Sequence, residues 1–206
     1  LGRAARLDDG ARRLVELVSM VPSRVTTALL DALMPAWTEA AEEPERRGLL
    51  QVGPQHVRFR HELARVAIRS SVPVARRRRL HAEILAGLLD SGADPAQIVH
   101  HAIEAGDDDA VADHALIAAR RAAAAESNRE AYAHYRRAIG FVDRLPETDR
   151  AVVFEEQATM AYTVDRLGDA FPAIESAIAW HAATGDRAGE GRCHRLLSRF
   201  HWYAGD

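Results

Sequence analysis

The sequence contains no lysine and a single cysteine, so all 27 of its positively charged side chains are arginines. Without lysine, the chain cannot carry the phosphate-binding loop Gly-x-x-x-x-Gly-Lys-Ser/Thr, and we do not expect this chain to hydrolyse ATP by itself. The arginine bias is typical of a GC-rich bacterial genome. A lone Cys193 excludes an internal disulfide, which suits a reducing compartment, and we therefore expect a cytoplasmic protein.

Long apolar runs and strong net charge are also lacking. No segment approaches the roughly 20 apolar residues of a membrane span, and Leu1 opens no signal-peptide pattern, so no membrane partner is expected. The net charge is only -3, which gives no sign of a polyanionic partner. Aromatic residues make up 6% of the chain while alanine is abundant, which favours closely packed helices over sheets. A length of 206 residues allows one medium domain or two small ones.

The first third of the chain predicts three helices and a hairpin. Apolar residues recur at helical spacing in residues 11–21, and further helices are expected at residues 23–33 and 36–47. Residues 49–52 and 56–59 alternate apolar and polar around Gly53-Pro54, which predicts two short strands. Three helices closed by a small hairpin make a winged helix, which we place at residues 1–72.

A fourth helix is expected to begin at His61, with one apolar face. That face comprises Leu63, Ala64, Ala67 and Ile68. Pro73 then marks a boundary, because the residue before a proline is disfavoured in helical conformation.

Beyond Pro73, every segment has helical periodicity. Residues 74–89 predict a long helix, and Asp94-Pro95 predicts the start of another, with an N-cap followed by proline at the first helical position. Further helices are expected at residues 128–145 and after Gly168-Asp169. The side chains expected to face inward in the long helix are Leu80, Ile84, Leu85, Leu88 and Leu89.

Small and apolar residues in the second half resemble the tetratricopeptide repeat, a pair of helices of roughly 34 residues. The positions that carry this resemblance are Ala131, Tyr135 and Ala138 in one unit and Ala161, Val164, Gly168, Asp169, Ala173 and Ile174 in the next. The spacing is irregular, which indicates divergent repeats. We therefore expect a mainly α fold, with an α-α superhelix of tetratricopeptide-like repeats at residues 73–206. Because the chain stops at Gly205-Asp206, where another helix should begin, we expect that the natural protein continues.

Taken together, the chain resembles the middle of large LuxR-type ATP-dependent transcriptional regulators, the MalT-like class of signal-transduction ATPases. The segments that carry this likeness are Phe59 to Ile68, Ala75 to Leu89, Ala119 to Ile139 and Leu196 to Gly205. In that family, a nucleotide-binding module precedes the winged helix, and a DNA-binding helix-turn-helix follows the repeats. The resemblance implies ATP or ADP as cofactor of the full-length protein only. It also implies that the partners are the protein's own ATPase and helix-turn-helix domains, and an inducer or peptide in the repeat groove.

One residue is a candidate for nucleotide chemistry. Arg60-His61-Glu62 is similar to the Met-His-Asp element of such ATPases, whose histidine reaches the β-phosphate of ADP; here arginine and glutamate replace the outer residues. A helix start adds a favourable dipole for phosphate. The other interpretation is that His61 caps its helix, and both remain open at this point.

Other polar clusters are interpreted structurally. The run Arg76-Arg77-Arg78-Arg79 points in all directions around a helix, so it predicts solvated surface with salt bridges. The candidate recognition helix at residues 36–47 carries several glutamates that would repel DNA, so no direct nucleic-acid contact is expected. His100 and His101 diverge by about 100° on a helix and so should not share a metal, and His61-Glu62 lacks the second histidine of a zincin. Neighbouring Cys193 and His194 should not face each other as a nucleophile pair.

The sequence thus predicts a non-catalytic signal-transducing segment with no metal. It would couple ligand or partner binding on the repeats to an ATPase and a DNA-binding domain. The alternative is a free-standing tetratricopeptide-type adaptor that docks a peptide in its groove. A stand-alone DNA-binding winged helix is a third possibility, which would show salt-dependent DNA affinity.

Overall fold

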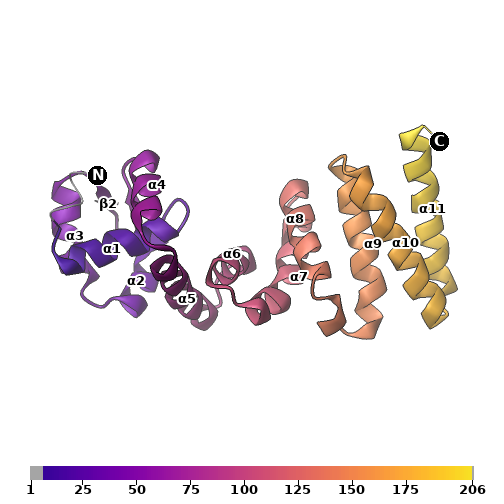
Figure 1. The fold of residues 1–206 in the computed structure, drawn as a ribbon, viewed down its shortest axis with the longest axis horizontal. Helices are drawn as coiled ribbons and strands as arrows, with labels where there is room; N and C mark the ends of the chain where they lie inside the picture. The colour runs from indigo at the N-terminus through magenta and orange to yellow at the C-terminus, as the bar shows by residue number, and fades with distance from the viewer. Residues whose placement is uncertain (1–6, 206) are drawn as a thin grey trace. The chain divides into compact units, whose positions relative to one another are not determined.

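The computed structural model describes residues 7–205, which form helices and one small sheet (Figure 1). The chain divides into two compact units, one up to Asp107 and one from Asp108 onward. Within residues 7–205, no helix is both long and apolar enough to cross a membrane.

The first unit contains short helices around a three-stranded antiparallel sheet. Its elements are α1 (Asp9–Met20), β1 (Val25–Thr26), α2 (Thr27–Leu33), α3 (Trp37–Arg46), β2 (Leu50–Val52), β3 (His56–Phe59), α4 (Glu62–Ser71), α5 (Val74–Ser91) and α6 (Pro95–Ala105). The strand order is β1-β3-β2, with Val25 opposite Val57 and Leu50 opposite Phe59. The two strands predicted around Gly53-Pro54 are therefore confirmed.

Strand β1 was not expected, because a helix was predicted from Ser23. Thr26 ends the strand, and its hydroxyl oxygen accepts a hydrogen bond from the Leu29 amide at 3.2 Å, which caps α2. A strand of two residues is too short to produce an alternating pattern. The sequence therefore showed only the helical periodicity of the residues that follow.

The core of the first unit lies around α1, which packs against α3, α4 and α5. Leu14 and Leu17 of α1 are fully buried, as are Leu30, Leu50 and Val57 from α2 and the sheet. These branched side chains close the interior between the helices and one face of the sheet.

Two of the predicted apolar faces are not buried in full. Leu63 of α4 is 85% exposed, and within α4 only Ile68 is buried. In α5, Leu80, Ile84, Leu85 and Leu88 are buried as predicted, but Leu89 is 41% exposed. Helical periodicity marks apolar residues that share a face, but it does not say whether another element covers that face.

The division between the two compact units falls after Asp107. Helix α5 packs against α1 and α2, and Arg76 of α5 lies 2.5 Å from the Glu16 carboxylate of α1. Helix α6 packs against α5, and its predicted start is confirmed, since the Asp94 side chain caps it and Pro95 is its first residue. Both helices thus fold with the first unit.

The second unit is a series of helices in which each packs against the next. It contains α7 (Asp108–Ala124), α8 (Asn128–Ile139), the 3-10 turn η1 (Val142–Arg144), α9 (Glu147–Thr163), α10 (Leu167–Thr184) and α11 (Arg187–Ala204). Figure 1 shows α9, α10 and α11 side by side, and α7 and α8 form the preceding pair. The helix predicted at residues 128–145 ends earlier, at Ile139, before Gly140 and η1.

Alanine lets these helices approach closely. Ala131, Ala161, Ala170 and Ala177 are fully buried, as is Ile174. Three of these, Ala131, Ala161 and Ile174, were among the residues that suggested repeats. The first helices of the pairs α7–α8 and α9–α10 begin at residues 108 and 147, a longer spacing than the roughly 34 residues of a regular tetratricopeptide repeat. The helical-repeat character of this unit is therefore confirmed in a divergent form.

Candidate functional site

His61 lies at the N-cap position of α4 and is exposed. Its side chain makes no capping hydrogen bond, so the interpretation of His61 as a side-chain cap is not supported. The start of α4 is held instead by Arg65, which pairs with Glu62 at 2.6 Å and donates a hydrogen bond to the Ser19 carbonyl at 2.8 Å. This pairing lowers the pKa of Glu62. The phosphate-sensor role of His61 stays a prediction.

A mainly apolar stripe, with one serine, follows His61 along the exposed side of α4. Leu63, Val66, Ala67 and Ser70 recur at steps of three and four residues, and all four are exposed. This spacing places them on one side of the helix, opposite to the side that buries Ile68. We call these four residues the α4 stripe.

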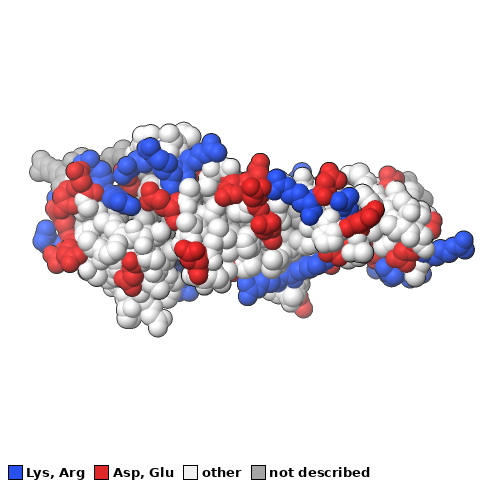
Figure 2. Space-filling view, turned by 90° about the horizontal axis from the view of Figure 1, so that it is seen from below, with Lys and Arg blue, Asp and Glu red and all other residues white. Residues whose placement is uncertain are grey.

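The arginine run of α5 serves contacts within the first unit. Besides the Arg76–Glu16 pair, Arg77 donates to the Val72 carbonyl at 2.8 Å, and Arg78 donates to the Ala105 carbonyl at the end of α6 at 2.6 Å. A cation at the last carbonyls of a helix interacts favourably with the helix dipole. On the face in Figure 2, basic and acidic side chains lie interspersed over each unit. A salt bridge of the predicted kind is confirmed at Arg76. Arg77 and Arg78 bind backbone carbonyls, and Arg78 and Arg79 are exposed.

The repeat unit has a pocket on α8, α9 and α11, with a volume of about 320 Å³. Its lining residues are Tyr135, Val152, Glu155, Glu156, Thr159, Met160 and Arg192. Burial, together with the nearby Glu156 carboxylate, raises the pKa of Tyr135 to about 12, so its hydroxyl stays protonated. Arg120 binds Glu156 at 3.1 Å, and Arg192 lies 3.5 Å from Glu155. The pocket is thus lined by apolar side chains together with paired charges. The sequence predicted a groove on this array but none of these residues.

Cys193 faces His181 and Glu155, not its neighbour His194. The donor atoms of Glu155, His181 and Cys193 lie within 4.8 Å of one another, on α9, α10 and α11. Burial and the Glu155 carboxylate raise the pKa of the Cys193 thiol to about 11, which makes it a weak nucleophile at neutral pH. The prediction that Cys193 and His194 form no nucleophile pair agrees with this arrangement.

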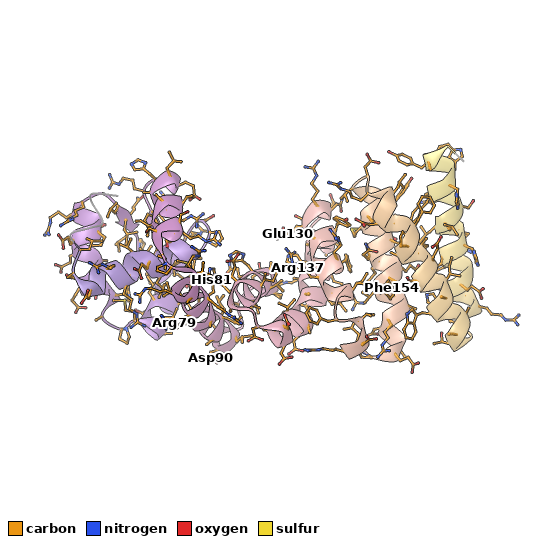
Figure 3. All side chains as sticks on the ribbon, viewed as in Figure 1. Arg79, His81, Asp90, Glu130, Arg137 and Phe154 are labelled. Atoms are coloured by element: carbon orange, nitrogen blue, oxygen red, sulfur yellow. The ribbon has the colours of Figure 1, made fainter. Side chains whose placement is uncertain are left out.

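His100 and His101 lie close together, contrary to the expectation that adjacent positions on a helix keep the two rings from a common site. Their ring centroids lie 4.9 Å apart, and the His101 centroid is 4.9 Å from that of His81 on α5. His81 reaches these two rings from α5, the packed neighbour of α6 (Figure 3). The geometry of α6 alone could not predict this cluster, because the third histidine, His81, lies on the neighbouring helix α5.

No protein-family model matches this sequence, and none of the curated proteins matches it. Among solved structures, the chain is similar to a Signal Transduction ATPase with Numerous Domains from Pyrococcus horikoshii, a protein with a tetratricopeptide repeat sensor. The similarity covers 98% of this chain and 36% of that protein, with a TM-score of 0.51 and 11% sequence identity. At this identity the likeness establishes a related helical fold. The chain spans about a third of the protein that it resembles.

Proposed function

We propose that this chain is a non-catalytic signal-transducing segment of a signal-transduction ATPase. The second unit binds an inducer or a partner protein through its helical repeats. The first unit, a winged helix extended by α5 and α6, docks on a nucleotide-binding domain. It transmits to that domain the conformational change that binding causes in the second unit. We place the whole protein among LuxR-type, MalT-like transcriptional regulators of the cytoplasm, with ATP or ADP bound by the ATPase domain and DNA bound by a separate helix-turn-helix.

The observation that carries this proposal is the fold likeness along nearly the whole chain to an ATPase with a repeat sensor. The order of elements supports it, because a helix-and-small-sheet unit precedes a series of packed helix pairs. Neither half alone is specific, since both kinds of unit occur in many proteins.

The α4 stripe supports the docking role of the first unit. Leu63 and Val66 expose apolar side chains on a helix whose other side is anchored to α1 by Arg65. Such a surface on a rigid helix suits a packed neighbour, and it begins directly after His61. A nucleotide-binding domain on the α4 stripe would therefore meet the histidine predicted to reach its phosphate.

The experiment is made in the natural full-length protein, with a transcriptional reporter and measurement of bound nucleotide. Deletion of residues 108–206 should abolish the response to inducer, because the deleted unit carries the proposed sensor. The coding sequence on either side should encode a phosphate-binding loop before Leu1 and a helix-turn-helix after Asp206. An intact inducer response after the deletion, or the absence of both flanking motifs, would contradict the proposal; the latter would favour an adaptor.

His61 is tested separately, by ADP retained through purification. His61→Ala should lower the retained ADP and raise basal transcription, because a hydrogen bond to phosphate is lost. His194→Ala is the matched control, as it removes an exposed histidine from the second unit. Equal ADP content in both variants and the wild type would exclude the sensor role of His61.

A further inference from the structure

Three imidazole rings meet inside the first unit, at the contact of α5 and α6. His81 and His101 are buried, with 0% and 1% exposure, and His100 is half-buried beside them. One donor nitrogen of each residue lies within 4.8 Å of the other two. The Nδ1 atoms of His81 and His101 are 2.9 Å apart.

Hydrogen bonds leave one buried nitrogen of His81 without a partner. The Nδ1–Nδ1 contact can satisfy one nitrogen of each ring, but Nε2 of His81 is buried without a hydrogen-bond partner and lies 3.7 Å from the Glu104 carboxylate. Leaving a buried polar atom without a partner destabilises the folded state. A bound cation would satisfy imidazole nitrogens that water cannot reach.

The rings are in the state that a metal requires. Burial lowers the pKa of His81 to about 4 and that of His101 to about 3, and in both cases the neighbouring His100 lowers it further. At neutral pH the rings of His81 and His101 therefore each keep a lone pair, which is the form that binds a metal ion.

We propose that His81, His100 and His101 bind one divalent transition metal ion of the zinc type. Three neutral imidazoles are a common ligand set for zinc and leave one of four tetrahedral positions open. Nitrogens bonded to zinc at about 2.1 Å lie roughly 3.4 Å apart in a tetrahedral site, so closure on an ion requires ring movements of about an ångström. The proposal is independent of the function proposed above.

The surroundings contain an outer shell and an access route. The carboxylate of Glu104, on α6, lies near Nε2 of His81. The guanidinium of Arg69 on α4 forms an ion pair with the same carboxylate at 3.1 Å. A carboxylate near a ligating imidazole orients the ring and strengthens the ligand. His101 also lines a pocket of about 540 Å³ in the first unit, whose wall includes Thr26, His56 and Gln97. An ion would enter the cluster from this pocket as the His101 ring moves to bind it.

The test uses the 206-residue chain without an affinity tag, stripped with a chelator and titrated with Zn²⁺ and Co²⁺. We expect one ion per chain by elemental analysis and a tetrahedral Co²⁺ visible spectrum. His81→Gln and His101→Gln should each weaken Zn²⁺ binding by ~100-fold or more, since loss of an outer-shell partner alone costs ~10–100-fold. His181→Gln is the matched control, because it removes a buried histidine from the other three-donor cluster.

A second measurement on the wild type does not depend on whether the variants fold. The ring ¹⁵N resonances of His81, His100 and His101 should shift on Zn²⁺ addition, while those of His114 and His194 stay unchanged. Loss of binding in His181→Gln but not in His101→Gln would overturn the proposal. Ring resonances of the three histidines that stay unchanged at saturating Zn²⁺ would overturn it as well.

Discussion

The hydroxyl group of Tyr132 in α8 donates a hydrogen bond to the carboxylate of Asp169 in α10, which joins the second helices of two successive pairs. Burial and this carboxylate both raise the pKa of Tyr132, so the hydroxyl keeps its proton. Because a hydrogen bond to a charged group is stronger than one between neutral groups, the contact fixes how one pair sits on the next.

Tyr132→Phe should therefore lower the free energy of unfolding of the second unit by about 1–2 kcal/mol. The measurement is urea denaturation followed by circular dichroism. Tyr203→Phe is the control, because that side chain is half exposed near the end of α11. In a double-mutant cycle, Asp169→Asn should add little to Tyr132→Phe, and fully additive effects would show that the two residues do not interact.

Phe200 closes the core formed by α9, α10 and α11. It is fully buried, its ring stacks on Tyr162 with centroids 4.9 Å apart, and it meets Phe171 edge to face at 6.0 Å. Phe200→Ala should cost about 3–5 kcal/mol, through lost burial and the cavity left behind. Trp202→Ala removes a larger side chain that is 79% exposed, and should change stability by no more than about 0.5 kcal/mol. Similar midpoints of urea denaturation for the two variants would contradict this packing.

Local signals in the sequence were sufficient for much of the fold. Asp94-Pro95 and the alternation around Gly53-Pro54 each depend on a few neighbouring residues, and the structure confirms both. The Gly106-Asp107 and Gly185-Asp186 pairs also end helices, with glycine φ angles of 71° and 73°. Gly168 does not, because it lies in the first turn of α10 and the preceding turn is made by Asp165 at φ 60°.

The candidate sites depend on contacts between helices, and these could not be predicted from single segments. The approach of His81 to His101 is set by the packing of α5 on α6, and that of Cys193 to His181 by the packing of α11 on α10. A one-helix argument gives the direction of each side chain but not its partner. The exposure of Leu63 could not be predicted either, because periodicity does not reveal which face of a helix another element covers.

Cys193 should react slowly with thiol reagents in the folded protein. With its pKa raised to about 11, the thiolate fraction at pH 8 is lower by ~100-fold than for a free cysteine with a pKa of about 8.5. Since the chain has one cysteine, the rate of reaction with Ellman's reagent reports this site alone. We expect the native rate to be slower than the rate in denaturant by ~100-fold or more. Equal rates would show an accessible, unperturbed thiol.

The raised pKa of Cys193 should also make the stability of the fold depend on pH. A group whose pKa is raised by folding stabilises the folded state fully below its unfolded pKa, and this contribution is lost as the pH rises toward the folded value. The free energy of unfolding should therefore fall between about pH 9 and pH 11. Cys193→Ala should make this fall shallower, as measured by urea denaturation at pH 8 and pH 10. An unchanged slope in the variant would assign the pH dependence to other groups.

Two glycines of α11 should respond to alanine in opposite directions. A Cβ atom at Gly189 would lie 2.3 Å from Nδ1 of His181 and 2.4 Å from the Asp186 carboxylate, which themselves are 2.9 Å apart. Gly189→Ala must push these groups apart, and we expect a loss of about 1–3 kcal/mol, as for overpacked cores. A Cβ atom at Gly191 approaches no side chain more closely than 4.0 Å, at Arg195. Gly191→Ala should therefore stabilise the helix by about 0.5–1 kcal/mol, because alanine restricts the unfolded chain and favours helix. Thermal denaturation of the two variants beside the wild type measures both effects, and a stabilising Gly189→Ala would mean that α11 does not lie against His181 as described.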